Sequence, residues 1–213
     1  AMAGSRGIPT CRVSQAAMSR MAWREHADAW LAVVALPETG LDTFARRSLP
    51  AGKEGGLYVI AEDAEKPGNL GAVLRSADAA GAHGFMAVDS RTDLGNANII
   101  RASKSAVFTM ACAEAGAQDA LAWCRAQGLR ILAATPSANK DYWDVDMRLP
   151  TMIAVGAEKE GLSEFWMDQA DERVLIPMKG QVNSLNLAQA ATLLLYEAAR
   201  QRQVLTREGR AQV

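Results

Sequence analysis

Five polar residues in three short segments have the side-chain types needed to handle a phosphate or a hydroxyl group. Asn69 and Arg75 lie six residues apart in a helical stretch. Glu158 lies in a turn between two glycines, and Ser184 and Asn186 precede a long apolar helical pattern. A guanidinium fork binds phosphate through paired hydrogen bonds, and a carboxylate or amide can orient a hydroxyl group.

The third segment has the form of a ligand-binding loop. An apolar strand end at 174–177 is followed by small and polar residues at 178–184, where a helical pattern starts. Free backbone N–H groups and side-chain caps gather where a polar loop enters a helix. In open α/β proteins, loops at the carboxyl ends of strands bind ligands. Simple helix capping by Ser184 and Asn186 is the structural alternative.

The first segment permits a functional and a purely structural interpretation. Gly68 and Gly71 allow a tight turn and a close approach, and Asn69 can cap the helix that it begins. Arg75 is then either a ligand-binding cation or a solvated arginine beside Asp78. The segment lacks the G-x-G-x-x-G spacing and the Walker lysine, so it matches a dinucleotide loop or a P-loop poorly.

The second segment follows a buried strand that ends at Gly156. Glu158 in this turn can orient a cation or a hydroxyl group, and Ser163 can cap the next helix. The alternative is a solvated turn, which is the simpler interpretation for Lys159 and Glu160.

The elements that position these segments alternate between apolar strands and helical patterns. Strands are predicted at 57–61, 84–88, 107–110, 130–134, 152–155 and 173–176. Helices are predicted at 69–80, 99–104, 117–127, 163–170 and 184–203, and the last is followed by a flexible tail at 206–213. This alternation indicates a mostly parallel sheet in an α/β domain, with helices on both faces.

The residues before this domain are predicted to be organised separately. Residues 1–10 are interpreted as a tag remnant or a disordered start, and 11–50 as a fragment of another domain with its linker. Within that fragment we expect a short helix capped by Ser14, a buried strand at 30–36 and a helix at 39–47. A turn-rich linker at 48–56 marks the boundary, so the main domain is expected to span 51–205.

Composition sets limits on the class of protein. The 213 residues are 49% hydrophobic with a formal net charge of -1, which suits one domain and a small appendage without a global basic signature. Cys11, Cys112 and Cys124 have no metal-ligand spacing and are predicted to be reduced thiols of a cytoplasmic protein. No apolar run reaches the roughly 20 residues of a membrane span, and the start does not resemble a signal peptide.

Taken together, the three segments resemble the motifs of the SpoU-type (TrmH-like) branch of the SPOUT RNA methyltransferases. The matching stretches are NLGAVLRSADAAG from Asn69, AVGAEKEGLS from Ala154 and IPMKGQVNSLNLAQAATLLLYEA from Ile176. The resemblance covers about 57–200. It implies a mostly parallel six-stranded sheet with a C-terminal deep trefoil knot, and a homodimer with the knot regions and the last helix at the interface. The Ala- and Leu-rich pattern of that helix separately indicates that its outer face is a subunit contact.

The resemblance also implies S-adenosylmethionine as the methyl donor, with no metal. By position, the donor contacts fall on backbone at Thr135, Gly156, Ile176 and Leu185. Backbone and apolar contacts suit an adenine ring held in a tight loop.

The implied reaction is methylation of a ribose 2′-hydroxyl, for which the catalytic residues would be Arg75, Asn69, Glu158, Ser184 and Asn186. A 2′-hydroxyl must lose its proton as it attacks the methyl group. Arg75 would serve as the base or would place the ribose and phosphate, and placement is physically simpler because a guanidinium presents only donors. Asn69 would hold the ribose or Arg75, and the remaining three residues would orient Arg75 and the loop. In the implied dimer, the partner subunit would be able to supply some of these residues.

RNA is the implied partner, and Arg101 and Lys104 are the predicted RNA-binding residues. Residues 11–50 resemble the end of an L30e-like RNA-binding domain, which favours rRNA over tRNA as the substrate. Ala157, Lys159 and Asn183 depart from the usual family residues and leave the details of donor binding and the RNA target open. The alternatives are a non-catalytic RNA-binding or ribosome-assembly factor and a nicotinamide-linked oxidoreductase, and the second lacks the glycine fingerprint.

Overall fold

The computed structural model describes residues 6–22, 30–48 and 56–211. The chain packs into two compact units, one that ends at Ala35 and a second that begins at Leu36. The start predicted to be a tag remnant falls partly outside the described residues, since 1–5 are not described.

The first unit contains one described helix, α2 (Gln15–Met21). Its cap is as predicted, because the Ser14 hydroxyl accepts a hydrogen bond from the Ala17 amide at 3.2 Å. The buried strand predicted at 30–36 is wrong: these residues form no strand, and Trp30 is 80% exposed and Val33 95% exposed. An apolar run becomes a strand only beside a partner strand, and the described part of this unit contains none.

The second unit is built on a six-stranded sheet with the order β3-β2-β1-β5-β4-β6. Its strands are β1 (Leu57–Glu62), β2 (Gly84–Val88), β3 (Cys112–Ala115), β4 (Arg130–Ala134), β5 (Thr151–Val155) and β6 (Glu172–Val174). Every pairing in the sheet is parallel. The predicted α/β class and mostly parallel six-stranded sheet are therefore confirmed.

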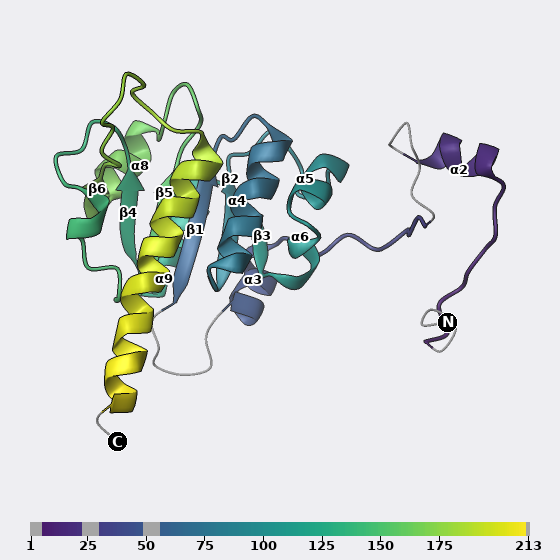
Figure 1. The fold of residues 1–213 in the computed structure, drawn as a ribbon, viewed down its shortest axis with the longest axis horizontal. Coiled ribbons are helices and arrows are strands. Elements are labelled where there is room, and N and C mark those ends of the chain that lie inside the picture. The colour runs from purple at the N-terminus through teal and green to yellow at the C-terminus, as the bar shows by residue number, and fades with distance from the viewer. Residues whose placement is uncertain (1–5, 23–29, 49–55, 212–213) are drawn as a thin grey trace. The chain divides into compact units, whose positions relative to one another are not determined.

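Helices cover both faces of this sheet (Figure 1). They are α3 (Leu41–Ser48), α4 (Pro67–Ala79), α5 (Ala97–Ala102), α6 (Ala106–Thr109), α7 (Ala117–Ala126), the 3-10 turn η1 (Tyr142–Asp144), α8 (Glu164–Gln169) and α9 (Leu187–Ala211). Alternate β1 residues enter two apolar clusters, Val59 in the one with α4, α5, α6 and α9, and Ile60 in the one with α3, α7 and α8. Two buried faces explain why the strands read as continuous apolar runs.

The short strand predicted at 107–110 is wrong. Ser105 takes a left-handed conformation (φ 69) and the chain then makes the single helical turn α6, whose Val107 is fully buried. The strand at this edge of the sheet is β3, a few residues later. Packing against α4 has overridden the strand preference of Val107 and Phe108.

Helix α9 begins later and continues further than predicted. It starts at Leu187 rather than Ser184, and the Asn186 side chain accepts a hydrogen bond from the Ala188 amide at 2.9 Å. It continues to Ala211, so the tail predicted to be flexible from 206 is helical up to that residue. Ala191, Leu194 and other residues of its inner face are buried against the sheet and α4.

Two predicted helix caps are also wrong. Helix α4 begins at Pro67 with Lys66 as its N-cap, which places Asn69 inside the first turn. Ser163 precedes α8, but its side chain makes no capping hydrogen bond with that helix. Both side chains are engaged elsewhere.

The second unit begins earlier than the expected boundary at residue 51. Phe44 of α3 is fully buried, and its ring packs edge-on against Trp123 with the centroids 5.0 Å apart. Helix α3 therefore belongs with the sheet, and the unit starts at Leu36. Most of the predicted linker lies outside the described residues, because 49–55 are not described.

Cys11, Cys112 and Cys124 are free thiols in the structure. Burial raises the pKa of the Cys112 and Cys124 thiols to about 12, so neither is poised to react. Among the described helices, none combines the length and apolar character needed to cross a membrane.

Candidate active site at the carboxyl ends of the strands

A cavity of about 630 Å³ opens at the carboxyl ends of β4, β5 and β6. Its wall comes from four segments, at 134–137, 155–162, 174–178 and 183–190, together with Met167 of α8. This volume is typical of small-molecule sites. The four positions predicted for donor contacts, Thr135, Gly156, Ile176 and Leu185, all line it.

The segments after β4 and β6 are joined by backbone hydrogen bonds. The Thr135 amide donates to the Val174 carbonyl at 2.9 Å, and the Leu175 amide donates to the Lys140 carbonyl at 2.9 Å. The Tyr142 amide donates a hydrogen bond to the Leu175 carbonyl at 3.0 Å. This ladder fixes one side of the cavity without side-chain chemistry.

The opposite side is the loop 156–162, which is packed too tightly for any side chain at its first residue. A Cβ atom at Gly156 would overlap the Gly161 carbonyl and the Leu162 nitrogen. Gly161 has a φ of +73 and donates its amide to the Ala157 carbonyl at 2.9 Å. Glycine at both positions therefore allows the chain to fold back along the cavity.

Glu158 is the centre of a polar cluster on this loop. Its Oε1 accepts hydrogen bonds from the Asn69 and Asn186 amides, each at 2.6 Å, and its Oε2 pairs with Lys66 at 2.5 Å. The Asn186 side chain also donates to the side-chain oxygen Oδ1 of Asn69 at 3.3 Å. Three segments far apart in sequence therefore meet at one carboxylate.

The cluster keeps Glu158 ionised. Lys66 first, and then the Asn69 amide, hold the pKa of Glu158 below its ordinary value of 4.5. A carboxylate whose pKa is lowered in this way is a weak base at neutral pH. Glu158 is suited to orienting Asn69 and Asn186 rather than to removing a proton.

A smaller cavity of about 130 Å³ lies against the polar cluster. It shares Glu158, Lys159 and Leu187 with the large cavity, and Lys66 and Asn69 complete its polar wall. Sequence reasoning did not find Lys66, because a lysine before Pro-Gly carries no pattern that separates it from a solvated one.

Arg75 lies apart from this cluster. It is exposed on α4, about 9 Å along the helix axis from Asn69, and lines neither cavity. Within the described part of the chain it makes no hydrogen bond or ion pair. Within one chain the structure thus brings together Asn69, Glu158 and Asn186, and Arg75 lies outside this group. Ser184 lines the large cavity, with one long contact to Asn183 at 3.5 Å.

A model of the SpoU rRNA Methylase family matches residues 56–196, which include every segment of this site. The chain belongs to the SpoU family.

Relatives in the SpoU family act on different RNAs. The chain is 35% identical over 181 residues to a 23S rRNA (uridine(2479)-2'-O)-methyltransferase of Streptomyces viridochromogenes, covering 81% of this chain and 60% of that protein. It is 38% identical over 160 residues to a tRNA (guanosine(18)-2'-O)-methyltransferase of Escherichia coli (strain K12), covering 69% of this chain and 64% of that protein. The chain therefore spans less than two thirds of the length of these two relatives.

The fold is also similar to that of a solved SpoU methyltransferase with its cofactor. The crystal structure of AviRb from Streptomyces viridochromogenes in complex with AdoMet has a TM-score of 0.72 and 33% identity, covering 79% of this chain and 66% of that one.

The basic residues predicted to bind RNA lie beside α4 on this SpoU scaffold. Arg101, in the last turn of α5, donates to the Asn98 side chain at 2.9 Å, and Lys104 follows in a left-handed conformation (φ 53). Both side chains are exposed. Helix α5 packs closely on α4, because a Cβ atom at Gly71 would collide with Ala102. Arg101 and Lys104 therefore lie in or just after the helix that packs on α4, which carries Arg75.

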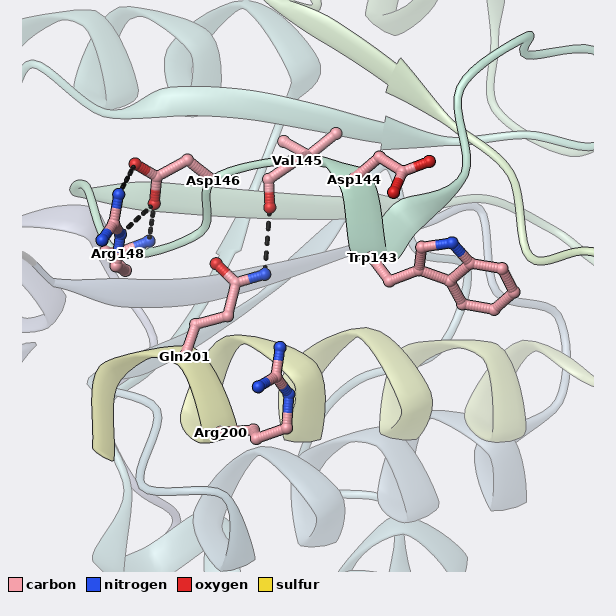
Figure 2. A pocket seen from close by; sticks show the side chains of 7 residues that line it. All are labelled: Trp143, Asp144, Val145, Asp146, Arg148, Arg200 and Gln201. Carbon is pink, nitrogen blue, oxygen red and sulfur yellow. Dashed lines mark hydrogen bonds and ion pairs between the residues drawn. The ribbon is translucent and has the colours of Figure 1, made fainter. Parts of the chain in front are cut away.

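A separate hollow of about 330 Å³ lies between residues 143–148 and the far part of α9. Figure 2 shows two pairs among its lining residues: Gln201 donates to the Val145 carbonyl at 3.0 Å, and Arg148 pairs with Asp146 at 2.8 Å. Gln201 also accepts from the Met147 amide at 2.7 Å. The hydrogen bonds of Gln201 hold α9 against residues 145–147. The hollow contains none of the SpoU motif residues. Among the described residues, no group of three or more His, Cys, Asp or Glu could hold a metal ion.

Proposed function

We propose that the protein transfers a methyl group from S-adenosylmethionine to a ribose 2′-hydroxyl of RNA, with rRNA favoured over tRNA. One observation carries this proposal: the cavity lined by all four predicted donor positions shares a wall with the Glu158 cluster. A donor and an acceptor bound in adjoining cavities would meet at that wall. The 2′-O-methyltransferase names of the two relatives support the reaction class.

The large cavity fits a nucleoside-sized donor. Its wall combines apolar side chains such as Val155, Ile176 and Leu187 with the backbone polar groups of three loops. Apolar contacts with a few polar groups that set orientation are the usual composition of such sites. When bound, S-adenosylmethionine supplies an electrophilic methyl group.

The residues around the smaller cavity are assigned to the acceptor. Asn69, held by Glu158, offers an amide side chain that can orient a ribose, and Asn186 donates to the same Glu158 oxygen. We assign Arg75 to the positioning of an RNA phosphate, because a guanidinium presents only donors and pairs with phosphate bidentately. Ser184 lies in the loop that would close over the donor.

We propose a homodimer through the outer face of α9. Leu193 is 40% exposed and Tyr196 is 50% exposed, one turn apart on the side opposite the buried Leu194. Exposed apolar side chains grouped on one face mark interaction surfaces. In such a dimer, Arg75 of one subunit could serve the Glu158 cluster of the other.

Charge on this face should break the dimer. The double change Leu193→Glu and Tyr196→Glu is expected to give a monomer at micromolar concentration in analytical ultracentrifugation, because it buries like charges in the interface. Ala122→Glu, on α7 over the other face of the sheet, is the matched control and should remain dimeric. A wild-type protein that sediments as a monomer would contradict the dimer itself.

The trefoil knot also belongs to the proposal. The chain after β6 pairs with the loop after β4 through Leu175 and then returns at 183–187 to the loop 155–162, where Asn186 contacts Glu158. A segment placed in this way has the course expected of the threaded end of a knot.

We also propose that the residues before Leu36 belong to an L30e-like domain. The exposed side chains of Trp30 and Val33 fit a surface that packs against other protein.

The function is tested by methyl transfer from labelled S-adenosylmethionine to bulk rRNA and bulk tRNA from a strain that lacks the protein. Label in one RNA class, at a site resistant to alkaline cleavage, is the expected result, and it also identifies the RNA class. Donor binding by calorimetry without transfer to any RNA, including assembled ribosomal particles, would instead support a non-catalytic RNA-binding factor.

We also propose that the protein acts in the cytoplasm, because its cysteines are free thiols and its proposed substrate is RNA.

A further inference from the structure

Glu62 is a buried carboxylate with no role in the function proposed above. It is the last residue of β1 and is 5% exposed. Its Oε2 accepts a hydrogen bond from the Ser163 amide at 2.8 Å, and its Oε1 accepts one from the Ser163 hydroxyl at 2.6 Å. A buried carboxylate is costly unless its oxygens are satisfied, and here one residue 101 positions away satisfies both.

Ser163 is committed to this contact. It stands at the N-cap of α8, where a serine hydroxyl usually accepts a hydrogen bond from the helix, but it makes no such bond. Its hydroxyl donates to Glu62 instead. The Ser163 hydroxyl therefore joins the end of β1 to the end of the loop 156–162 instead of capping α8.

The Glu62–Ser163 contact lies at one end of a closed ring. From Glu62 the chain continues through 63–69 to Lys66 and Asn69, and from Ser163 it leads back through the loop to Glu158. At the other end Lys66 and Asn69 meet Glu158, at 2.5 and 2.6 Å. The ring has two limbs, residues 62–69 and residues 158–163, and the small cavity lies between them. The second limb also lines the large cavity.

We propose that Glu62, acting through Ser163, is a positioning residue that sets the separation between the acceptor cavity and the donor cavity. The inference rests on the proposed function of these two cavities. Glu62 is not among the described residues that line either cavity, so it would act only by holding the two limbs together. Small displacements of bound reactants are costly, since about 1 Å can reduce a rate on the order of 100-fold.

The test compares Ser163→Ala, Ser163→Thr and Glu62→Leu. Ser163→Ala should lower the single-turnover rate at saturating donor and RNA by about 10-fold, while the donor dissociation constant changes less than about 3-fold because three other segments hold the donor. Ser163→Thr keeps the hydroxyl and should restore most of the rate. The double variant of Glu62→Leu with Ser163→Ala should be no slower than Glu62→Leu alone, since the two residues act as one unit.

Tyr58→Phe is the matched control, because it removes a different buried hydrogen bond, from the Tyr58 hydroxyl to the Ser48 carbonyl at 3.0 Å. It should lower the thermal midpoint comparably and leave the single-turnover rate unchanged. Equal rate losses in Tyr58→Phe and Ser163→Ala, or a wild-type rate in Ser163→Ala, would overturn the proposal.

Amide hydrogen exchange separates this inference from the proposed function. Exchange in 157–162 should be faster in Ser163→Ala and Glu62→Leu than in the wild-type protein or Tyr58→Phe, whether or not RNA is methylated. A wild-type protein without transferase activity contradicts the proposed function alone. Unchanged exchange of these amides in both variants contradicts the positioning role alone.

Discussion

Arg75→Ala is expected to abolish methyl transfer while S-adenosylmethionine binds almost as tightly as to the unchanged protein. Arg75 lines neither cavity of its own subunit, so its removal leaves the donor contacts intact. Loss of the guanidinium fork removes the group proposed to hold an RNA phosphate, and a misplaced acceptor should cost at least about 100-fold in rate. Initial rates with RNA, together with calorimetric titration of the donor, measure the two effects separately.

Two further arginine variants make this result specific. Arg75→Lys keeps the charge without the planar fork and should recover only a small part of the rate. Arg46→Ala removes an exposed arginine from α3, over the other face of the sheet, and should behave as the wild-type protein. Activity retained in Arg75→Ala would exclude Arg75 from the mechanism.

Gly156→Ala is expected to impair donor binding strongly. The new methyl group would overlap the backbone of Gly161 and Leu162, so the loop that forms one wall of the cavity would have to move. Overpacking of this kind costs about 1–3 kcal/mol. If this cost falls on the bound state, donor affinity should decrease by about 5- to 150-fold.

Calorimetric donor titration and the thermal midpoint check this second result. Gly180→Ala is the control, since a Cβ atom there meets nothing within 4 Å and donor affinity should hardly change. Wild-type donor affinity in Gly156→Ala would show that the loop 156–162 is not the donor wall. A folded protein with weakened donor binding is the outcome that supports the assignment.

The central strands were predictable because both of their faces are buried. Apolar runs such as 57–61 and 152–155, each bounded by glycine or proline, therefore gave correct strands. The edge strand β3 was missed because Cys112 to Ala115 are small or polar residues with little strand preference. The Val-Phe-Thr stretch before it has that preference, but tertiary packing makes it a helical turn. The run at 30–36 is similarly apolar, yet lies in a unit without a described sheet.

The positions that the family resemblance implied for donor contacts meet in one cavity for a topological reason. Thr135, Gly156 and Ile176 follow strand ends, and the carboxyl ends of parallel strands open on the same edge of a sheet. Lys66 and Glu62 could not be found in this way, because their partners lie 92 and 101 residues away and no local pattern records such contacts. Asn69 looked like a helix cap locally, and only the folded chain shows that its amide is bound to Glu158.

The separation of 117 residues between Asn69 and Asn186 has a consequence for the newly made chain. Chains leave the ribosome from their N-terminus, and domains generally fold as units. The inner face of α9 packs on α4 and the sheet, and Asn186 immediately precedes that helix. A nascent chain without α9 thus has a partly uncovered sheet and lacks one wall of the cavity. The site at which we propose methyl transfer is therefore complete only after α9 has emerged from the ribosome.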